Sequence, residues 1–196
     1  MSVATLVTHS PVETRRVGSA LAVVLEANDV VLLAGPLGAG KTEFTKGIAE
    51  GLGITEPVVS PTFTLAREYQ GHAEGRDEAR VQSHGQAQTH GQAQGDGEAG
   101  LRLLHVDLYR LDRAQEVIDL GLDDLAGDDA VTVVEWGDLA VALFPVDHLE
   151  VNLELSPHDE LDQDRIISFT VSGVSWHERQ VALAAALAAY SPGTPG

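Results

Sequence analysis

The chain has 196 residues, a formal net charge of −18 and no cysteine, a length that predicts one domain over residues 1–196. The missing cysteines exclude disulfides, thiolate catalysis and Cys-ligated metal sites. Because such an acidic surface repels phosphate backbones and anionic lipids, we expect no direct nucleic-acid or membrane binding. Because no signal peptide or membrane-spanning apolar run is visible, we predict a cytoplasmic protein.

The first half of the chain alternates between helical and strand patterns. Ser10 and Glu13 form a capping-box signature, which predicts a helix that ends near Asn28. A buried strand at 30–34, a glycine-rich turn at 35–40 and a helix at 41–51 follow. Further strands are predicted at about 63–69, 101–107, 130–135, 149–155 and 166–172, and a last helix at about 176–189. This alternation predicts an α/β layer architecture.

Residues 71–100 interrupt the pattern. Val81 is their only apolar residue larger than alanine, and the string HGQAQ occurs at 84–88 and again at 90–94. His72, His84 and His90 are irregularly spaced, so we predict a solvated, mobile insertion rather than a metal-binding tract. The last six residues, SPGTPG at 191–196, are predicted to be a disordered tail.

The string GPLGAGKT at 35–42 has the spacing of a P-loop, or Walker A motif, between a strand and a helix. Its glycines let consecutive N–H groups point inward and form an anion nest at a helix N-terminus. Lys41 supplies an ammonium for the β- and γ-phosphates, and Thr42 a hydroxyl for Mg²⁺. With the alternating elements, this predicts a P-loop NTPase-like three-layer α/β/α fold with a mostly parallel central sheet and antiparallel additions.

Two carboxylates stand where predicted strands end. Asp107 lies in LRLLHVDLYRL and Glu135 in DAVTVVEWGDL. Because the carboxyl ends of parallel strands converge on the ligand crevice, either side chain could reach a γ-phosphate or its metal ion. The structural alternative for each is a helix N-cap or a surface carboxylate.

Three neighbours of these acids have two interpretations each. His105 shares a strand face with Asp107, so it is either polar support for the site or a buried histidine with satisfied hydrogen bonds. Arg110 either neutralises phosphate or pairs with an acid. Trp136 either stacks at the nucleotide or a docking edge, or packs in the core.

The segment VVSPTFTLAREY follows the glycine-rich turn and its helix at the distance typical of a switch loop. Pro61 stiffens it, and the hydroxyls of Ser60, Thr62 and Thr64 could be ordered by a γ-phosphate and Mg²⁺. The alternative is a plain loop that leads into a strand.

Together, GPLGAGKT, SPTFTL, HVDLYRL, IDLGLDDL and VVEW, in that order, resemble the TsaE (YjeE-type) family of bacterial ATPases. The resemblance covers about residues 10–70 and 101–172. It implies a role in the threonylcarbamoyladenosine modification of tRNA, through ATP binding and hydrolysis coupled to the TsaD and TsaB proteins. Members of the family are weak ATPases alone and are stimulated by that complex, and tRNA would be reached only through these partners.

The resemblance also implies residue roles. The phosphates would be held by Gly38, Ala39, Gly40, Lys41 and Thr42, and Mg²⁺ by Thr42 and Glu135. Asp107 would be the catalytic acid, with Lys41 and Thr62 in SPTF as further catalytic residues. His9 and Pro11 would contact the nucleotide base, and Trp136 would lie at the nucleotide or partner edge.

Three features depart from the family pattern. Pro36 stands where aspartate is usual, Phe63 where tyrosine is usual, and typical members lack the insertion at 71–100. Pro36 removes one N–H at an outer position of the loop, so phosphate binding is expected to survive. The insertion is expected to be tolerated because the cost of closing a loop grows only logarithmically with its length.

Two other functions remain open from the residues. A small-molecule kinase shares the P-loop but transfers phosphate to an acceptor, and release of phosphate without acceptor would exclude it. A non-catalytic, nucleotide-gated binding module would keep its function when Asp107 is replaced by alanine.

Overall fold

The computed structural model describes residues 1–72, 99–110, 130–139, 141–156 and 163–190. The strands in these ranges are β1 (Ser2–Thr8), β2 (Val30–Ala34), β3 (Ala66–His72), β4 (Ala99–Asp107), β5 (Ala130–Glu135), β6 (His148–Leu155) and β7 (Arg165–Ser172). The α-helices are α1 (Pro11–Ala22), α2 (Lys41–Gly51) and α6 (Val174–Leu187), and the short 3₁₀ helices are η1 (Gly137–Leu139), η2 (Val141–Leu143) and η3 (Ala188–Tyr190).

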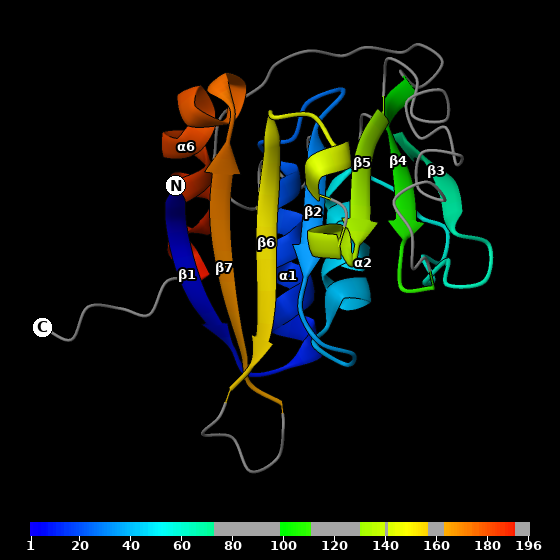
Figure 1. The fold of residues 1–196 in the computed structure, drawn as a ribbon, viewed down its shortest axis with the longest axis horizontal. Coiled ribbons are helices and arrows are strands. Elements are labelled where there is room, and N and C mark those ends of the chain that lie inside the picture. Colours follow the sequence, from blue (N-terminus) through cyan, green and yellow to red (C-terminus); the bar gives the residue numbers. More distant parts are fainter. Residues whose placement is uncertain (73–98, 111–129, 140, 157–162, 191–196) are drawn as a thin grey trace, which may run out of the picture.

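The strands form one sheet in the order β1-β7-β6-β2-β5-β4-β3, seen face-on in Figure 1. The central strands β6, β2, β5 and β4 pair in parallel, whereas β7, β1 and β3 are added antiparallel at the two sides. This confirms the predicted P-loop NTPase-like α/β fold, with the parallel part confined to the middle of the sheet. The carboxyl ends of β2, β4 and β5 therefore meet at one edge.

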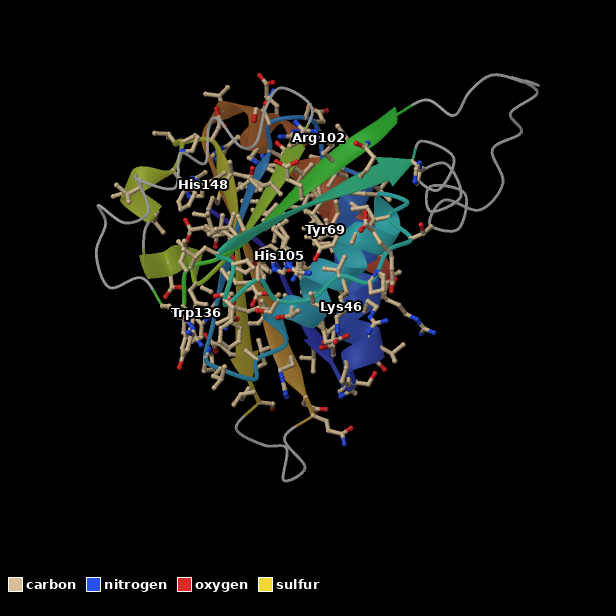
Figure 2. The ribbon with its side chains drawn as sticks, turned by 90° about the vertical axis from the view of Figure 1, so that its right-hand side faces the viewer. Lys46, Tyr69, Arg102, His105, Trp136 and His148 are labelled. Carbon is tan, nitrogen blue, oxygen red and sulfur yellow. The ribbon has the colours of Figure 1, made fainter. Side chains whose placement is uncertain are left out.

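The main core lies between one sheet face and the helices α1, α2 and α6. Figure 2 shows α1 and α2 together on one side of the sheet. Alternate residues of the buried strand β2 separate the two faces: Val31 and Leu33 belong to this core, whereas Val30 and Leu32 belong to a smaller cluster on the opposite face. Val141 and Phe144, in and after η2, pack against that smaller cluster.

Helices α1 and α2 touch through their backbones. A Cβ atom on Gly18 would lie 2.2 Å from the carbonyl oxygen of Phe44, and one on Gly47 would lie 1.9 Å from that of Arg15. Both positions require glycine because no larger residue fits between helices at this separation. The close contact seats α2, which begins at Lys41, directly on α1.

The predicted elements agree with the structure in order but differ at several ends. The capping box is present, since the Ser10 hydroxyl accepts a hydrogen bond from the N–H of Glu13. However, α1 ends at Ala22 rather than near Asn28, and Leu25 stays fully buried in the turns that follow. The strand expected at 63–69 is wrong at its start: Pro61 and Leu65 close a turn, Leu65 has a φ of 64°, and the strand begins at Ala66.

Strand β1 was not predicted. It lies at the sheet edge, where only Leu6 and Thr8 are buried, so its alternation is too weak to read from the sequence. The expected helix at 176–189 is α6, which begins two residues earlier at Val174.

The predicted insertion is wrong at both ends. Gly71 and His72 belong to β3, Ala99 and Gly100 belong to β4, and His72 pairs with Ala99. The rest of that prediction lies outside the described residues, as do the tail at 191–196 and the whole IDLGLDDL motif at 118–125. Within the described ranges, no helix is long and apolar enough to cross a membrane.

Candidate functional site

The glycine-rich turn joins β2 to α2 with three glycines in the left-handed or neighbouring region. Gly35, Gly38 and Gly40 have φ values of 130°, 81° and 100°. A Cβ atom on Gly35 would also lie 2.1 Å from the carbonyl oxygen of Leu153 on β6. Helix α2 starts at Lys41 with no side-chain cap, so its first-turn N–H groups face the turn as an anion site requires.

Lys41 crosses this turn and is almost fully buried. Its Nζ donates to the carbonyl oxygens of Gly35 (2.7 Å) and Pro36 (2.9 Å) and lies 3.8 Å from the ring centroid of Trp136. Burial lowers the pKa of Lys41, while the nearby carboxylates of Glu135 and Asp107 act in the opposite direction. The ammonium is thus held inside the site among a few fixed partners.

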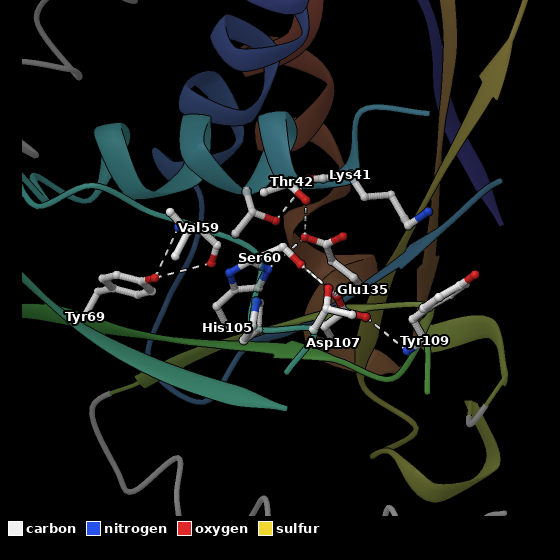
Figure 3. Close-up of polar contacts among 12 residues, drawn as sticks. Lys41, Thr42, Val59, Ser60, Tyr69, His105, Asp107, Tyr109 and Glu135 are labelled. Carbon is white, nitrogen blue, oxygen red and sulfur yellow. Dashed lines mark hydrogen bonds and ion pairs between the residues drawn. The ribbon is translucent and has the colours of Figure 1, made fainter. Parts of the chain in front are cut away.

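The side chains of Thr42, in the first turn of α2, and Glu135, at the end of β5, meet as Figure 3 shows. The Thr42 hydroxyl donates to Oε1 of Glu135 (2.8 Å), and His105 Nε2 contacts the same oxygen at 2.9 Å. His105 Nδ1 has no hydrogen-bond partner within the described residues, so the contact of Nε2 with Glu135 is the one that orients the ring. A hydroxyl beside a carboxylate is a pair of hard oxygen donors that suits Mg²⁺.

Asp107 ends β4 directly beside Glu135 in the parallel β4–β5 pairing. Its Oδ2 accepts from the hydroxyls of Ser60 (2.8 Å) and Thr62 (2.5 Å), and its Oδ1 from the N–H of Tyr109 (3.0 Å). The structure therefore brings the SPTF segment into contact with Asp107. The sequence alone had left open whether this segment is a switch loop or a plain loop. The N–H of Asp107 also binds the carbonyl of Leu65 (2.9 Å), so this segment is attached to β4 at two levels.

Trp136 follows Glu135 with a φ of 63°, which is rare for a large side chain. This backbone places its ring against Lys41 and 5.0 Å, centroid to centroid, from the ring of Tyr109. It is only partly buried and also packs against the smaller apolar cluster, so it lies where the site meets that cluster. Arg110 lies over the exposed ring of Phe63 (4.2 Å), a contact that the sequence did not indicate.

Within the described part of the chain, neither His9 nor Pro11 makes a hydrogen bond or ion pair with Lys41, Thr42 or Glu135. His9 Nδ1 contacts Oδ1 of Asp164 (2.9 Å), and Pro11 is the first residue of α1. Arg165, which follows Asp164 in the sequence, donates to the carbonyl oxygens of Ala39 (3.1 Å) and Gly38 (3.2 Å). Sequence reasoning missed Arg165 because it binds main-chain oxygens and belongs to no motif.

The parallel strands, the glycine-rich turn and the acids at the ends of β4 and β5 define an α/β protein of the P-loop NTPase-like type. The family model of the threonylcarbamoyl adenosine biosynthesis protein TsaE matches residues 8–90 and 86–167. The chain belongs to the TsaE family, which places it among the proteins of tRNA threonylcarbamoyladenosine biosynthesis.

Individual relatives agree with this family. The tRNA threonylcarbamoyladenosine biosynthesis protein TsaE of Bacillus subtilis is 37% identical over 166 residues, covering 85% of this chain and 84% of the relative. The Streptomyces coelicolor protein of the same name is 36% identical over 172 residues, covering 87% of this chain and 99% of its own length. The crystal structure of Bacillus subtilus YdiB superposes with a TM-score of 0.66 at 31% identity, covering 94% of this chain and 96% of that one.

Proposed function

We propose that this protein is a Mg²⁺-dependent ATPase that acts with a TsaD–TsaB type complex in the threonylcarbamoyladenosine modification of tRNA. One observation carries the proposal: Thr42 with Glu135, and Thr62 with Asp107, form two hydroxyl–carboxylate pairs beside Lys41. These residues come from α2, β5, β4 and the 59–65 segment. Their convergence at one helix N-terminus supplies what phosphoryl transfer to water requires.

The phosphate chain would bind the N–H groups at the start of α2, with Lys41 neutralising the β- and γ-oxygens. For this, Lys41 exchanges its contacts with the carbonyls of Gly35 and Pro36, at least in part, for phosphate oxygens. Thr42 and Glu135 would hold Mg²⁺, which would supply positive charge to neutralise the phosphates. Glu135 is buried and already oriented by His105, so its carboxylate needs no rearrangement.

Asp107 would orient the attacking water and accept its proton. A carboxylate offers about four lone-pair sites. Three are occupied by Ser60, Thr62 and the N–H of Tyr109, so one remains for water. Thr62 would then leave Asp107 when the γ-phosphate and Mg²⁺ offer it a new partner, and the 59–65 segment would act as the switch.

The net charge of −18 supports protein partners over RNA. An acidic surface is attracted to basic protein surfaces and repelled by the tRNA backbone. We therefore assign tRNA contact to the TsaD–TsaB type complex.

Phosphate release by the purified protein, with and without the TsaD–TsaB pair, tests the activity. We expect slow release alone, faster release with the pair, and loss in both settings for Lys41→Ala. The matched control is Lys46→Ala, since Lys46 pairs with Glu43 on the outer side of α2. Normal hydrolysis by Lys41→Ala in both settings would overturn the site assignment, and phosphate transfer only to an added acceptor would favour a kinase.

Asp107→Asn separates catalysis from gating. The amide keeps the size of the carboxylate but cannot accept a proton, so ATP affinity should be retained while release falls by about 10²-fold or more. If the variant still supports tRNA modification fully, nucleotide-dependent docking without hydrolysis is the function instead.

A further inference from the structure

We propose that Arg165 is a positioning residue of the phosphate turn, a role that rests on the proposed nucleotide-binding function. Its guanidinium holds the carbonyls of Gly38 and Ala39 on the outer side of the turn. It thereby fixes two successive peptide planes of the anion nest. Arg165 is the first residue of β7 and is separated from Ala39 of the turn by 126 positions in the sequence.

The direction of these contacts follows from peptide geometry. In a trans peptide the C=O and N–H groups point in opposite directions across one plane. When Arg165 holds the carbonyl of Ala39, the N–H of Gly40 in the same plane is directed away from the guanidinium. The same relation joins the carbonyl of Gly38 to the N–H of Ala39, which donates to the carbonyl of Pro36 (3.2 Å) in this conformation.

These two planes need an external support because glycines flank them. Gly38 and Gly40 both have positive φ values, and glycine rotates more freely than other residues. No atom of the described residues outside the adjacent chain lies within 4 Å of the position a Cβ atom would take on Gly38, and the neighbouring Leu37 is 75% exposed. The tip of the turn is therefore open, whereas the Ala39 side chain is fully buried.

Arg165 is also well placed to stay still. It begins β7 between two strands, paired in register with Thr8 of β1 and Leu155 of β6. Its Nη1 donates to the carbonyl of Asp164 (3.0 Å) in addition to the two contacts with the turn. A planar guanidinium can hold neighbouring carbonyls with separate N–H groups, which a lysine ammonium does less well.

The test compares Arg165→Gln and Arg165→Lys with the control Arg102→Gln. Arg102 lies near the start of β4, where it pairs with Glu68 of β3. Calorimetric titration measures the affinities for Mg-ATP, Mg-ADP and inorganic tripolyphosphate. We expect Arg165→Gln to weaken all three by about tenfold, because the nest N–H groups serve every ligand with a β-phosphate. Arg165→Lys should recover part of the loss, and Arg102→Gln should bind as the wild type does.

The amide resonance of Gly40 gives a readout that a general loss of stability would not move. In the nucleotide-free protein it should shift in Arg165→Gln and stay unchanged in Arg102→Gln. An unchanged Gly40 resonance with wild-type affinities would overturn the positioning role. A loss confined to ATP would also overturn it, since the guanidinium would then contact the γ-phosphate itself.

These outcomes are separable from failure of the proposed function. If the wild-type protein binds none of the three ligands, the nucleotide site itself is wrong. If the wild type binds and Lys41→Ala does not, while Arg165→Gln binds normally, only the role of Arg165 is wrong.

Discussion

Lys41 shows at the scale of one residue how stability is exchanged for function. Its ammonium is nearly buried, and burial lowers its pKa. Two carbonyls and the Trp136 ring contact it in place of water, and the negative charges of Glu135, Asp107 and Asp138 act on it from further away. The ammonium is therefore already inside the site, and in the proposed function it needs only to exchange these carbonyl contacts for phosphate oxygens.

Glu43 offers a pH-dependent test on the outer side of the same helix. Burial acts to raise its pKa, but hydrogen bonds from Lys46 and Arg15 outweigh this and lower it. A lowered carboxyl pKa contributes stability that is present above the unfolded value of about 4.3 and is lost as the pH falls through the folded value. We expect Glu43→Gln to lower the free energy of unfolding by about 1 kcal/mol at pH 7, after allowance for solvent screening.

Urea unfolding at several pH values checks this expectation. The difference between Glu43→Gln and the wild type should shrink as the pH falls below the unfolded pKa of about 4.3 and through the lowered pKa of the folded protein. Glu56→Gln on an exposed loop is the control. A difference that stays constant from pH 7 to pH 3 would show that the ion pairs of Glu43 add nothing.

The sequence identifies most readily the site residues that belong to a motif with fixed spacing. Lys41, Thr42, Thr62, Asp107 and Glu135 stand in motifs, because the chemistry fixes both their type and their spacing, and the structure brings them together. Their roles as ligands and catalysts remain predictions.

Residues that act through other protein groups carry a weaker signal. His105 could be named from the strand alternation, but its contact with Glu135 depends on the pairing of β4 with β5. Arg165 could not be identified from the sequence. Its guanidinium binds main-chain oxygens, which every residue has, so the contact does not require particular residue types in the turn. His9 and Pro11 belong to no motif, so the sequence could not establish which N-terminal positions correspond to the family's base-contacting residues.

At the scale of elements, the contact between α1 and α2 predicts a sensitive position at Gly47. Alanine is the better helix former, yet its Cβ would meet the carbonyl of Arg15 at 1.9 Å. We expect Gly47→Ala to lower the free energy of unfolding by about 2 kcal/mol or more, as overpacked cores do, and to weaken ATP binding because α2 moves with Lys41.

Denaturant unfolding and nucleotide titration measure both effects, with Glu50→Ala on the exposed side of α2 as the control. The control should change stability by about 0.5 kcal/mol at most. A Gly47→Ala variant that is as stable as the wild type would mean that the helices separate at no cost.

Element types were predictable where one period dominated, as in β2 and α2. Element ends were not, because tertiary contacts decide them. Leu25 continues the apolar face of α1 past the helix end, and the backbone at Asn28, with a φ of 68°, turns the chain into β2. Leu65 sits in a β-rich run but adopts a left-handed conformation that lets its carbonyl bind Asp107.

For the whole molecule, the pairing of His72 with Ala99 predicts that the sequence between them is dispensable for the fold. Replacing residues 73–98 with an Asn-Gly turn should close β3 and β4 as a hairpin. We expect unchanged affinity for Mg-ATP and a gain of about 1–2 kcal/mol in the free energy of unfolding, because a shorter loop costs less entropy to close.

Urea unfolding and calorimetric titration of the shortened chain beside the full chain check this. A protein that unfolds or loses nucleotide affinity would show that residues 73–98 contribute to the core or to the site. Retained affinity with impaired stimulation by the TsaD–TsaB pair would assign the segment to partner binding.

The contact between α1 and α2 also limits how the site can adapt. Because their backbones touch at Gly18 and Gly47, neither helix can slide along the other, and the start of α1 and the phosphate turn form one rigid body. Among the described residues, the chain between Val59 and Leu65 is joined to Asp107 by hydrogen bonds, so we expect this segment to adjust first if a nucleotide binds. Substitutions in the 59–65 segment should therefore change how the site adapts without disturbing the packing of α1 against α2.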